Sequence, residues 1–418
     1  MTGLKAYEKY KKVKYDYVSQ LPVGWQLWKI GHAFNLIGSG TTPQSGNIKF
    51  YENGSVNWIN TGDLNDGVLD SCKNKITEEA FKKHSVLKIY PKGTLLVAMY
   101  GATIGKVAVM NIEGSTNQAC CALAKSKILI NKFALYWFLA NRKNIVNLSY
   151  GGGQPNISQD VIKKLKIIAP PLEVQNNIVT YLDKKNNKID KFIRNKERLI
   201  ELLEDKRKEM IDNNLSSFKN LETNKKPLKY LVRLVSNLTT KLTKEVTYLA
   251  LENIESWTGK IDLSIGQGQF ESTVKKFKKT DVLFNKLRPY LAKVVIPDFN
   301  GVCVSEILVL RPSKKIDRKF LFYKLISRRF IDYVDTSTYG SKMPRASYDF
   351  IGKIEIEYPT QIDVQKNIVR KIEQKESKIE NLKNKYKKEI SSIKEYRESL
   401  ITQVVTGQLK VPYLMKVK

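Results

Sequence analysis

The feature that most constrains this chain is an internal repeat. Segment 172–179 (LEVQNNIV) returns as segment 362–369 (IDVQKNIV), about 190 residues further along the chain. A Tyr-Gly pair and a Pro-x-x-Ser-x-Asp pattern precede both copies, within 150–160 and within 339–349. This period is too long for a solenoid, whose repeats span roughly 20–50 residues. It indicates two copies of a whole domain, each with its own helix.

Each copy predicts one long helix. Apolar residues recur at heptad spacing after Ile178 and after Ile368, and neither stretch contains Pro or Gly. Such a repeat over four heptads is typical of a coiled coil. Two ordinary buried helices are the alternative, but each would be about 60 Å long. Each copy offers one seam, so the simplest arrangement pairs the two helices antiparallel. The predicted seam is Ile178, Leu182, Ile189, Phe192, Leu199, Leu203 and Met210 with Ile368, Ile372, Ile379, Leu382, Tyr386, Ile393 and Leu400.

The rest of each copy predicts a mixed domain, so the fold class is α+β. Strands are expected at 56–60, 94–99, 106–109 and 166–169, and again at 247–251, 281–285, 292–296 and 307–310. Helices with apolar faces are expected at 132–144 and 319–334. The predicted organisation is a basic N-terminal segment (1–20), a first domain (21–171), a central long helix (172–218), a second domain (219–361), a C-terminal long helix (362–407) and a tail (408–418).

The charge of the chain predicts a polyanionic partner. Its 72 Lys and Arg residues against 41 Asp and Glu residues give a net charge of +31. The two predicted long helices are nearly balanced, so most of the excess lies on the domains and the N-terminal segment. That distribution favours a nucleic-acid surface. A lysine-rich surface inherited from an AT-rich genome remains open as the alternative.

Cysteine and histidine usage predicts neither a disulfide framework nor a metal site. The four cysteines (Cys72, Cys120, Cys121 and Cys303) contain no C-x-x-C pair, and the histidines are only two. No apolar run is long enough to cross a membrane, and the N-terminus lacks the apolar core of a signal peptide. We therefore expect a soluble cytoplasmic protein.

The glycine-rich stretch Tyr100–Lys106 (YGATIGK) resembles a nucleotide-binding loop at first sight. A P-loop requires G-x-x-x-x-G-K-[ST], but here the spacing is one residue short and Val107 replaces the hydroxyl residue. The second copy reads Arg288–Lys293 (RPYLAK) at the same place, without glycine. We therefore exclude ATP binding and predict a strand–turn–strand element that presents Lys106 and Lys293 to DNA. For either lysine alone, a plain surface residue after a turn fits equally well.

Other catalytic patterns are absent from the sequence. The loop of amino-group methyltransferases, [NDS]-P-P-[YFW], is not matched by Pro170-Pro171, which lie between Ala169 and Leu172. A P-D…[DE]-x-K nuclease pattern would start at Pro297, but no lysine follows Glu306 at the required place. A large basic chain without such residues is typical of a recognition subunit.

A series of motifs runs through the chain. They are Leu21–Trp25 (LPVGW), Gly38–Pro43 (GSGTTP), Trp58–Leu64 (WINTGDL), Tyr100–Lys106 (YGATIGK), Thr116–Ala119 (TNQA), Gly153–Ser158 (GQPNIS), Pro170–Gln175 (PPLEVQ) and Leu400–Gly407 (LITQVVTG). In this combination the chain resembles the specificity subunits of type I restriction–modification systems over nearly its whole length. The second copy departs from the pattern, because it has no GSGTTP run and opens at Lys226-Pro227-Leu228 without tryptophan.

The resemblance implies two target-recognition domains that read the two halves of a bipartite double-stranded DNA target, with the long helices fixing an unread gap. It also implies docking of two modification (methyltransferase) subunits and of restriction subunits. S-adenosylmethionine would then be held by the methyltransferase partners, ATP and Mg by the restriction partner, and no cofactor by this non-catalytic chain. The alternatives are a free-standing DNA-binding protein, an ATP-using enzyme at Tyr100–Lys106, and a coiled-coil assembly protein whose charge is incidental.

Base reading is expected from polar loop side chains, with Lys and Arg placing the protein on phosphates. For Asp63, Tyr100 and Tyr290 a structural role, as a turn carboxylate or core aromatics, is weighed slightly ahead. The candidate DNA-contacting residues are Thr41, Thr61, Asp63, Tyr100, Lys106, Asn117, Gln118, Gly153, Gln154 and Asn156 in the first domain, and Asn253, Lys286, Arg288, Tyr290, Lys293, Lys342 and Arg345 in the second.

Overall fold

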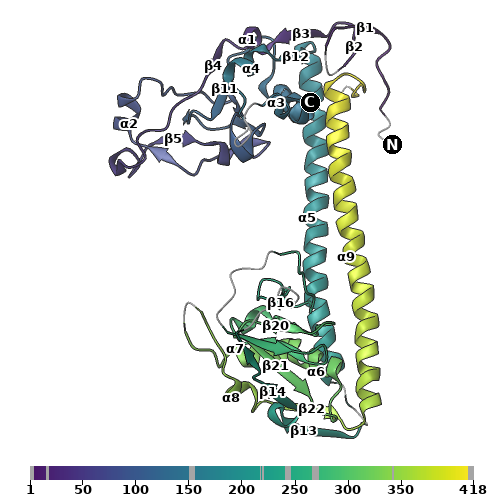
Figure 1. Ribbon diagram of the computed structural model, residues 1–418. Helices are drawn as coiled ribbons and strands as arrows, with labels where there is room; N and C mark the ends of the chain where they lie inside the picture. The colour runs from purple at the N-terminus through teal and green to yellow at the C-terminus, as the bar shows by residue number, and fades with distance from the viewer. Residues whose placement is uncertain are drawn as a thin grey trace. The chain divides into compact units, whose positions relative to one another are not determined.

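The computed structural model contains two compact units with mixed α and β structure (Figure 1). It describes residues 4–15, 18–149, 156–216, 218, 221–240, 246–265, 273–340 and 343–412. The first unit consists of residues 1–195 and 388–418, and the second unit of residues 196–387. The predicted α+β class and the two long helices are confirmed.

Two long helices, α5 (Leu172–Ser216) and α9 (Ile362–Val405), each contribute one part to each unit. Within the second unit they run antiparallel, because Glu204 of α5 contacts Lys383 of α9, whereas Asn214 contacts Lys375. Within the first unit, Asp190 of α5 pairs with Arg397 of α9. No helix in the described ranges combines the length and the apolar character needed to cross a bilayer.

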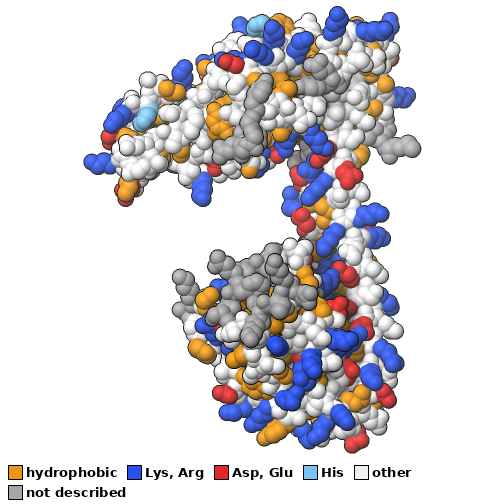
Figure 2. Space-filling model, in the orientation of Figure 1, with side chains coloured by type: hydrophobic (Ala, Val, Ile, Leu, Met, Phe, Trp, Pro, Cys, Tyr) orange, Lys and Arg blue, Asp and Glu red, His pale blue; other side chains and the backbone are white. Residues whose placement is uncertain are grey.

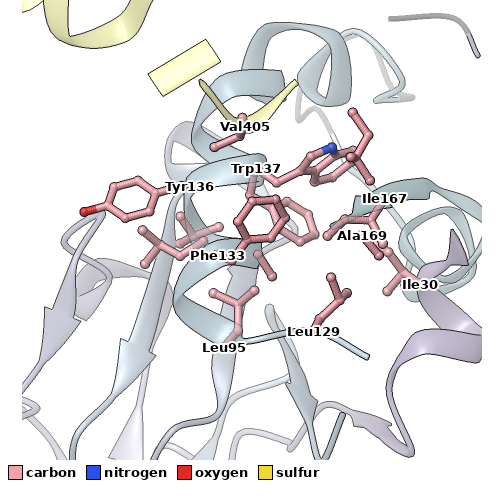
Figure 3. Close-up of a cluster of buried hydrophobic side chains, with 14 of the residues drawn as sticks. Ile30, Leu95, Leu129, Phe133, Tyr136, Trp137, Ile167, Ala169 and Val405 are labelled. Carbon is pink, nitrogen blue, oxygen red and sulfur yellow. The ribbon is translucent and has the colours of Figure 1, made fainter. Parts of the chain in front are cut away.

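The first unit is built on a five-stranded sheet in the order β4-β11-β8-β9-β6. Helix α3 packs against strands β8 and β9, and its apolar side chains form the centre of a buried cluster that also contains Val405 of α9 (Figure 3). The elements of this unit are β1 (Tyr10–Lys12), β2 (Gln20–Pro22), β3 (Gln26–Lys29), α1 (Ile30–Ala33), β4 (Leu36–Gly38), η1 (Ile48–Phe50), β5 (Val56–Ile59), η2 (Thr61–Asp63), β6 (Val68–Leu69), β7 (Lys75–Ile76), α2 (Glu78–Lys83), β8 (Leu95–Ala98), η3 (Gly101–Thr103), β9 (Val107–Met110), β10 (Ser115–Thr116), β11 (Cys120–Ala124), α3 (Asn131–Val146), α4 (Gln159–Lys164) and β12 (Lys166–Ala169).

The second unit contains two four-stranded sheets, in the orders β14-β21-β18-β19 and β15-β17-β20-β16. Its elements are β13 (Thr223–Pro227), η4 (Leu228–Tyr230), β14 (Val232–Val235), β15 (Leu238–Thr239), β16 (Tyr248–Leu249), β17 (Val274–Phe277), β18 (Val282–Asn285), η5 (Pro289–Leu291), β19 (Val294–Val295), β20 (Gly301–Cys303), β21 (Ile307–Pro312), α6 (Arg318–Ile326), α7 (Arg328–Asp335), α8 (Tyr348–Ile351) and β22 (Glu355–Pro359). Each strand predicted from the sequence overlaps an observed one. The helix predicted at 319–334 is two helices, because extended Ser327 caps the second one with its hydroxyl.

A buried glutamine explains the repeated segment. Gln175 and Gln365 are both fully buried near the start of α5 and α9. The side-chain oxygen accepts from a backbone N–H of the domain, from Ile130 at 2.8 Å and from Asp317 at 2.7 Å. The side-chain nitrogen donates to the carbonyl of the proline before the helix, at 2.7 Å and 2.8 Å. The repeated glutamine therefore ties each long helix to its own domain.

The helix seam differs from the predicted one at three positions. Phe192, Leu199 and Leu382 are 38%, 39% and 42% exposed. Ile193 and Lys383, one residue further along, are each 8% exposed. The cause is geometric, since an α-helix has about 3.6 residues per turn and drifts away from a strict 3.5-residue repeat. Several other predicted seam residues are buried, namely Ile178, Leu182, Ile189, Ile372, Ile379 and Leu400.

Candidate nucleic-acid interface

The glycine-rich stretch of the first unit is a tight turn between two antiparallel strands, β8 and β9. Gly101 and Gly105 have φ values of +66° and +77°, which glycine adopts without strain. A Cβ atom at Gly105 would lie 3.0 Å from Cγ2 of Val146 and 3.2 Å from Cγ of Arg142, both on α3. The backbone conformation and the close packing of α3 therefore account for this glycine.

The second unit repeats this turn with other residues. It joins β18 to β19, and the residues at the two left-handed positions are Arg288 (φ +51°) and Ala292 (φ +45°). The same backbone hydrogen bond closes both turns. It runs from Ala98 N to the Lys106 carbonyl at 2.8 Å, and from Asn285 N to the Lys293 carbonyl at 3.0 Å. Because a left-handed non-glycine residue costs about 1–2 kcal/mol, the arginine stands at a strained position.

Several candidate residues of the first unit surround this turn. Tyr100 is 37% exposed and forms a β-bridge with Asn156. Gln118 is exposed, and its side-chain oxygen accepts a hydrogen bond from the Thr42 hydroxyl at 2.6 Å. Lys106 is partly buried at the end of the turn. Gly153 and Gln154 lie outside the described residues.

Other candidates of the first unit hold loops in place. Both Asp63 oxygens accept backbone N–H bonds, from Asn60 at 2.8 Å and from Lys73 at 3.2 Å. The Asn117 side-chain oxygen accepts from Ala119 N at 3.1 Å. The Thr41 carbonyl accepts from the Trp58 indole at 3.1 Å, and Thr61 opens η2. These contacts are structural, as expected of a turn carboxylate.

The second unit places two cations on one carboxylate next to its turn. Glu306 lies 3.0 Å from a terminal nitrogen of Arg345 and 3.8 Å from Nζ of Lys286. The Arg345 side chain is 42% exposed and that of Glu306 is 17% exposed. Two cations against one largely buried anion leave a net positive charge at this place. Sequence patterns gave no indication of this role for Glu306.

Two candidates of the second unit point inward. Asn253 is 1% exposed, and its amide accepts from Ala250 N at 2.9 Å and donates to the Asp262 carbonyl at 2.9 Å. Lys293 donates from Nζ to the Leu251 carbonyl at 2.6 Å, and burial lowers the pKa of this lysine. Both side chains thus stabilise the segment after β16. Lys342 lies outside the described residues.

Exposed aromatic rings accompany the cations of the second unit. Tyr290, in the turn, is 46% exposed. Tyr339 is 64% exposed and pairs with Arg345 through two backbone hydrogen bonds of 3.2 and 3.1 Å. In the sequence, Tyr339 belongs to the Tyr-Gly pair that precedes the second copy of the repeat. Its match to Tyr150 in the first copy was the signal that could have drawn attention to it.

The resulting surface is basic and polar (Figure 2). Lys and Arg side chains are spread over the visible face of both units (Figure 2). Among the described residues, no group of three or more His, Cys, Asp or Glu side chains could hold a metal ion. The cysteines are unpaired, and burial raises the pKa of Cys121 and Cys303 to about 12, which keeps both thiols protonated. Such a surface suits binding to a polyanion.

Comparison with curated proteins yields relatives of similar length. The chain is 23% identical over 397 residues to the type I restriction enzyme EcoDI specificity subunit of Escherichia coli, covering 86% of this chain and 88% of the relative. It is 25% identical over 431 residues to the MjaIX specificity subunit of Methanocaldococcus jannaschii, covering 95% and 96%.

Solved structures agree on the fold. A chain from a structure of a type I R-M system superposes with a TM-score of 0.68 at 14% identity, covering 93% of this chain and 99% of that one. The HsdS subunit from Thermoanaerobacter tengcongensis gives a TM-score of 0.51 at 15% identity, covering 93% and 98%. The family model described as type I restriction modification DNA specificity domain matches residues 22–204 and 264–392. These matches span well over half of the sequence, and the chain belongs to this family of type I restriction–modification DNA specificity subunits.

Proposed function

We propose that this specificity subunit reads a bipartite double-stranded DNA target, with one half-site contacted by each unit. The observation that carries the proposal is the repeated turn. The two units share its backbone hydrogen bond and its left-handed positions, yet carry Gly101 and Gly105 in one and Arg288 and Ala292 in the other. One scaffold with different side chains suits two domains that read different bases.

Arg288 is the strongest candidate for base reading. Arginine donates two parallel hydrogen bonds to the O6 and N7 atoms of guanine, the commonest specific contact in the major groove. The exposed part of Arg345 and the side chain of Lys286 would contact phosphates, which fix the position of the domain on the duplex. In the first unit, Gln118 and Tyr100 are the exposed candidates for base contacts.

The two long helices would set the number of unread base pairs between the half-sites. Two methyltransferase subunits would dock on the chain, bring S-adenosylmethionine and act on an adenine flipped out of the duplex. A restriction subunit would bring ATP and Mg. In this division of work the chain's own residues bind DNA, position it and hold the partners, and the chemistry belongs to the partners.

The test of this function is a map of adenine methylation in the host genome, with and without the gene for this chain. We expect one bipartite motif to lose its methylation when the gene is deleted and to regain it when the gene is restored. A free-standing DNA-binding protein would leave the methylation map unchanged. That result would contradict the proposed function if the methyltransferase subunit is expressed.

The spacer role has a separate test. A matched insertion of one heptad into both α5 and α9 lengthens the pair by about 10 Å, which corresponds to about three base pairs of B-DNA. The methylated motif should keep both half-sites and acquire a longer gap. An unchanged gap in a folded, active variant would contradict the spacer role.

A further inference from the structure

The two units contain the same two-stranded sheet with different charges on it. In the first unit β3 pairs antiparallel with β12, and in the second unit β13 pairs antiparallel with β22. In each unit the second of these strands leads directly into a long helix. β22 carries two exposed carboxylates, Glu355 and Glu357. At the spacing of the repeat, their counterparts in β12 are Lys166 and the buried Ile168. The first unit thus has a cation and an apolar side chain where the second unit has two anions.

Two lysines face each other across the sheet of the first unit. The register places Lys29 of β3 directly opposite Lys166 of β12, and both side chains are exposed. The Cβ atoms of such a pair lie about 5 Å apart, and like charges there destabilise the sheet. Within the described part of the chain, neither lysine forms an ion pair. The sheet of the second unit, by contrast, contains an ion pair of 2.6 Å between Lys225 and Glu355. The first unit therefore keeps a repulsive pair that its counterpart avoids.

A third cation joins this pair from helix α4. The backbone N–H of Ile30 donates to the Leu165 carbonyl at 2.9 Å, which holds the end of α4 beside the end of β3. Lys164, the last residue of α4, is exposed and has no carboxylate partner among the described residues. Figure 2 shows Lys and Arg side chains gathered along this edge of the first unit, over β3 and α4. The three cations, here named the basic edge, are Lys29, Lys164 and Lys166.

The basic edge lies one short helix away from the turn that presents the candidate base contacts. Tyr100 of this turn forms a β-bridge with Asn156. Helix α4 then runs for six residues, about 9 Å, and ends at Lys164. At about 3.4 Å per base pair, this length corresponds to about three base pairs of duplex. Figure 1 shows α5 starting beside β12 and running away from it. Because α5 belongs to the proposed spacer over the unread gap, the basic edge lies on the outer side of the first half-site.

The chemistry of the basic edge fits DNA phosphates better than a protein partner. Lysine is depleted at the centre of protein–protein interfaces, whereas Lys and Arg are common donors to phosphate oxygens. A phosphate placed between Lys29 and Lys166 would also relieve their mutual repulsion. We propose that the basic edge binds phosphates of the duplex immediately outside the first half-site, and that the corresponding sheet of the second unit makes no such contact. This inference rests on the proposed function, to which it adds a contact beyond the bases that are read.

The experiment uses the full chain in complex with the methyltransferase subunits of its own system. The probes are duplexes with the methylated motif that end at both half-sites, or that extend beyond one half-site or the other by roughly 10 base pairs, about one helical turn. Affinity is measured for each duplex over a series of salt concentrations. The test variant combines Lys29→Gln, Lys164→Gln and Lys166→Gln. The matched control removes the same number of cations from the corresponding sheet of the second unit and its neighbourhood, by Lys225→Gln, Lys226→Gln and Lys353→Gln.

We expect the test variant to bind the duplex extended at one end roughly tenfold more weakly than the wild type does. Its affinity for the other two duplexes should not change. The slope of log K against log salt should become shallower by about 2 to 3 on the affected duplex, because each phosphate contact contributes about 0.9. The control should retain the wild-type values. Lys166→Glu alone should cause a loss of similar size, because it removes one cation and neutralises Lys29 across the sheet.

Three results would overturn the inference. The first is a test variant with unchanged affinity and salt dependence on every duplex. The second is an equal loss at both ends, or an equal loss in the control, which would indicate a general effect of net charge. The third is weaker assembly with the methyltransferase subunits at unchanged DNA affinity, which would show that the basic edge meets an acidic protein surface. The proposed function fails separately, if the wild-type complex binds the motif no better than a random duplex.

Discussion

The two units share the backbone of one turn but place different side chains on it. The turn after β8 and the turn after β18 close with the same hydrogen bond and place two residues in the left-handed region. One turn uses glycine at both positions, whereas the other uses Arg288 and Ala292. By contrast, the buried glutamine that ties each long helix to its domain is the same residue in both units. The comparison teaches that anchoring contacts are shared and surface side chains are free to vary.

The largest expected effect comes from removing a shared anchor. Gln175→Ala leaves the Ile130 N–H and the carbonyls of Ile128 and Pro170 without their partner. We expect the first unit to lose about 3 kcal/mol of unfolding free energy, because each unsatisfied buried group costs about 1–3 kcal/mol. Chemical denaturation and hydrogen exchange, read separately for each unit, check this. Asn176→Ala, at the exposed neighbour, should have little effect.

An intermediate effect is expected from exchanging the turn residues. Gly105→Ala places a methyl group 3.0 Å from Val146 at a φ of +77° and should destabilise the first unit by about 1–2 kcal/mol. The reciprocal change, Ala292→Gly, relieves the left-handed strain and should lower the unfolding free energy of the second unit by a smaller amount. Thermal unfolding of the two variants measures the difference. Equal losses would show that the two turns do not share one backbone requirement.

The smallest expected effect concerns the carboxylate between two cations. Glu306→Gln removes the charge that holds Lys286 and Arg345 and should raise affinity for non-specific DNA roughly threefold at low salt. Discrimination of the target should fall, because Arg345 loses its anchor. Competition binding with specific and random duplexes measures both quantities. Glu222→Gln, exposed in the same unit, is the matched control.

Much of this architecture could be predicted from the sequence. The repeated segment that contains Gln175 and Gln365 predicted the duplication and the start of both long helices. The segment recurs because its glutamine ties each long helix to its own domain by the same hydrogen bonds. The second-copy residues at Arg288–Lys293 excluded a P-loop, and the structure accounts for Gly105 by its backbone and by the packing of α3.

Other features depend on tertiary contacts that no pattern reveals. A heptad assignment seeks apolar residues and therefore overlooked Lys383, which is buried because Glu204 and Glu380 pair with it. The helix at 319–334 breaks because Ser327 caps a new helix, although the apolar spacing continues through it. Asn253 was a candidate reader by its residue type, but its amide is taken up by the backbone of its own loop.

The central claim is that each unit reads one half-site with side chains set on a common scaffold. The most direct measurement is the genome-wide methylation motif of a host that carries only the Arg288→Ala variant. Because Arg288 has no counterpart side chain at Gly101, we predict that one half of the motif becomes degenerate at a single base pair, while the other half and the gap stay unchanged. Loss of sequence preference in both halves, or a motif identical to the wild type, would contradict the claim.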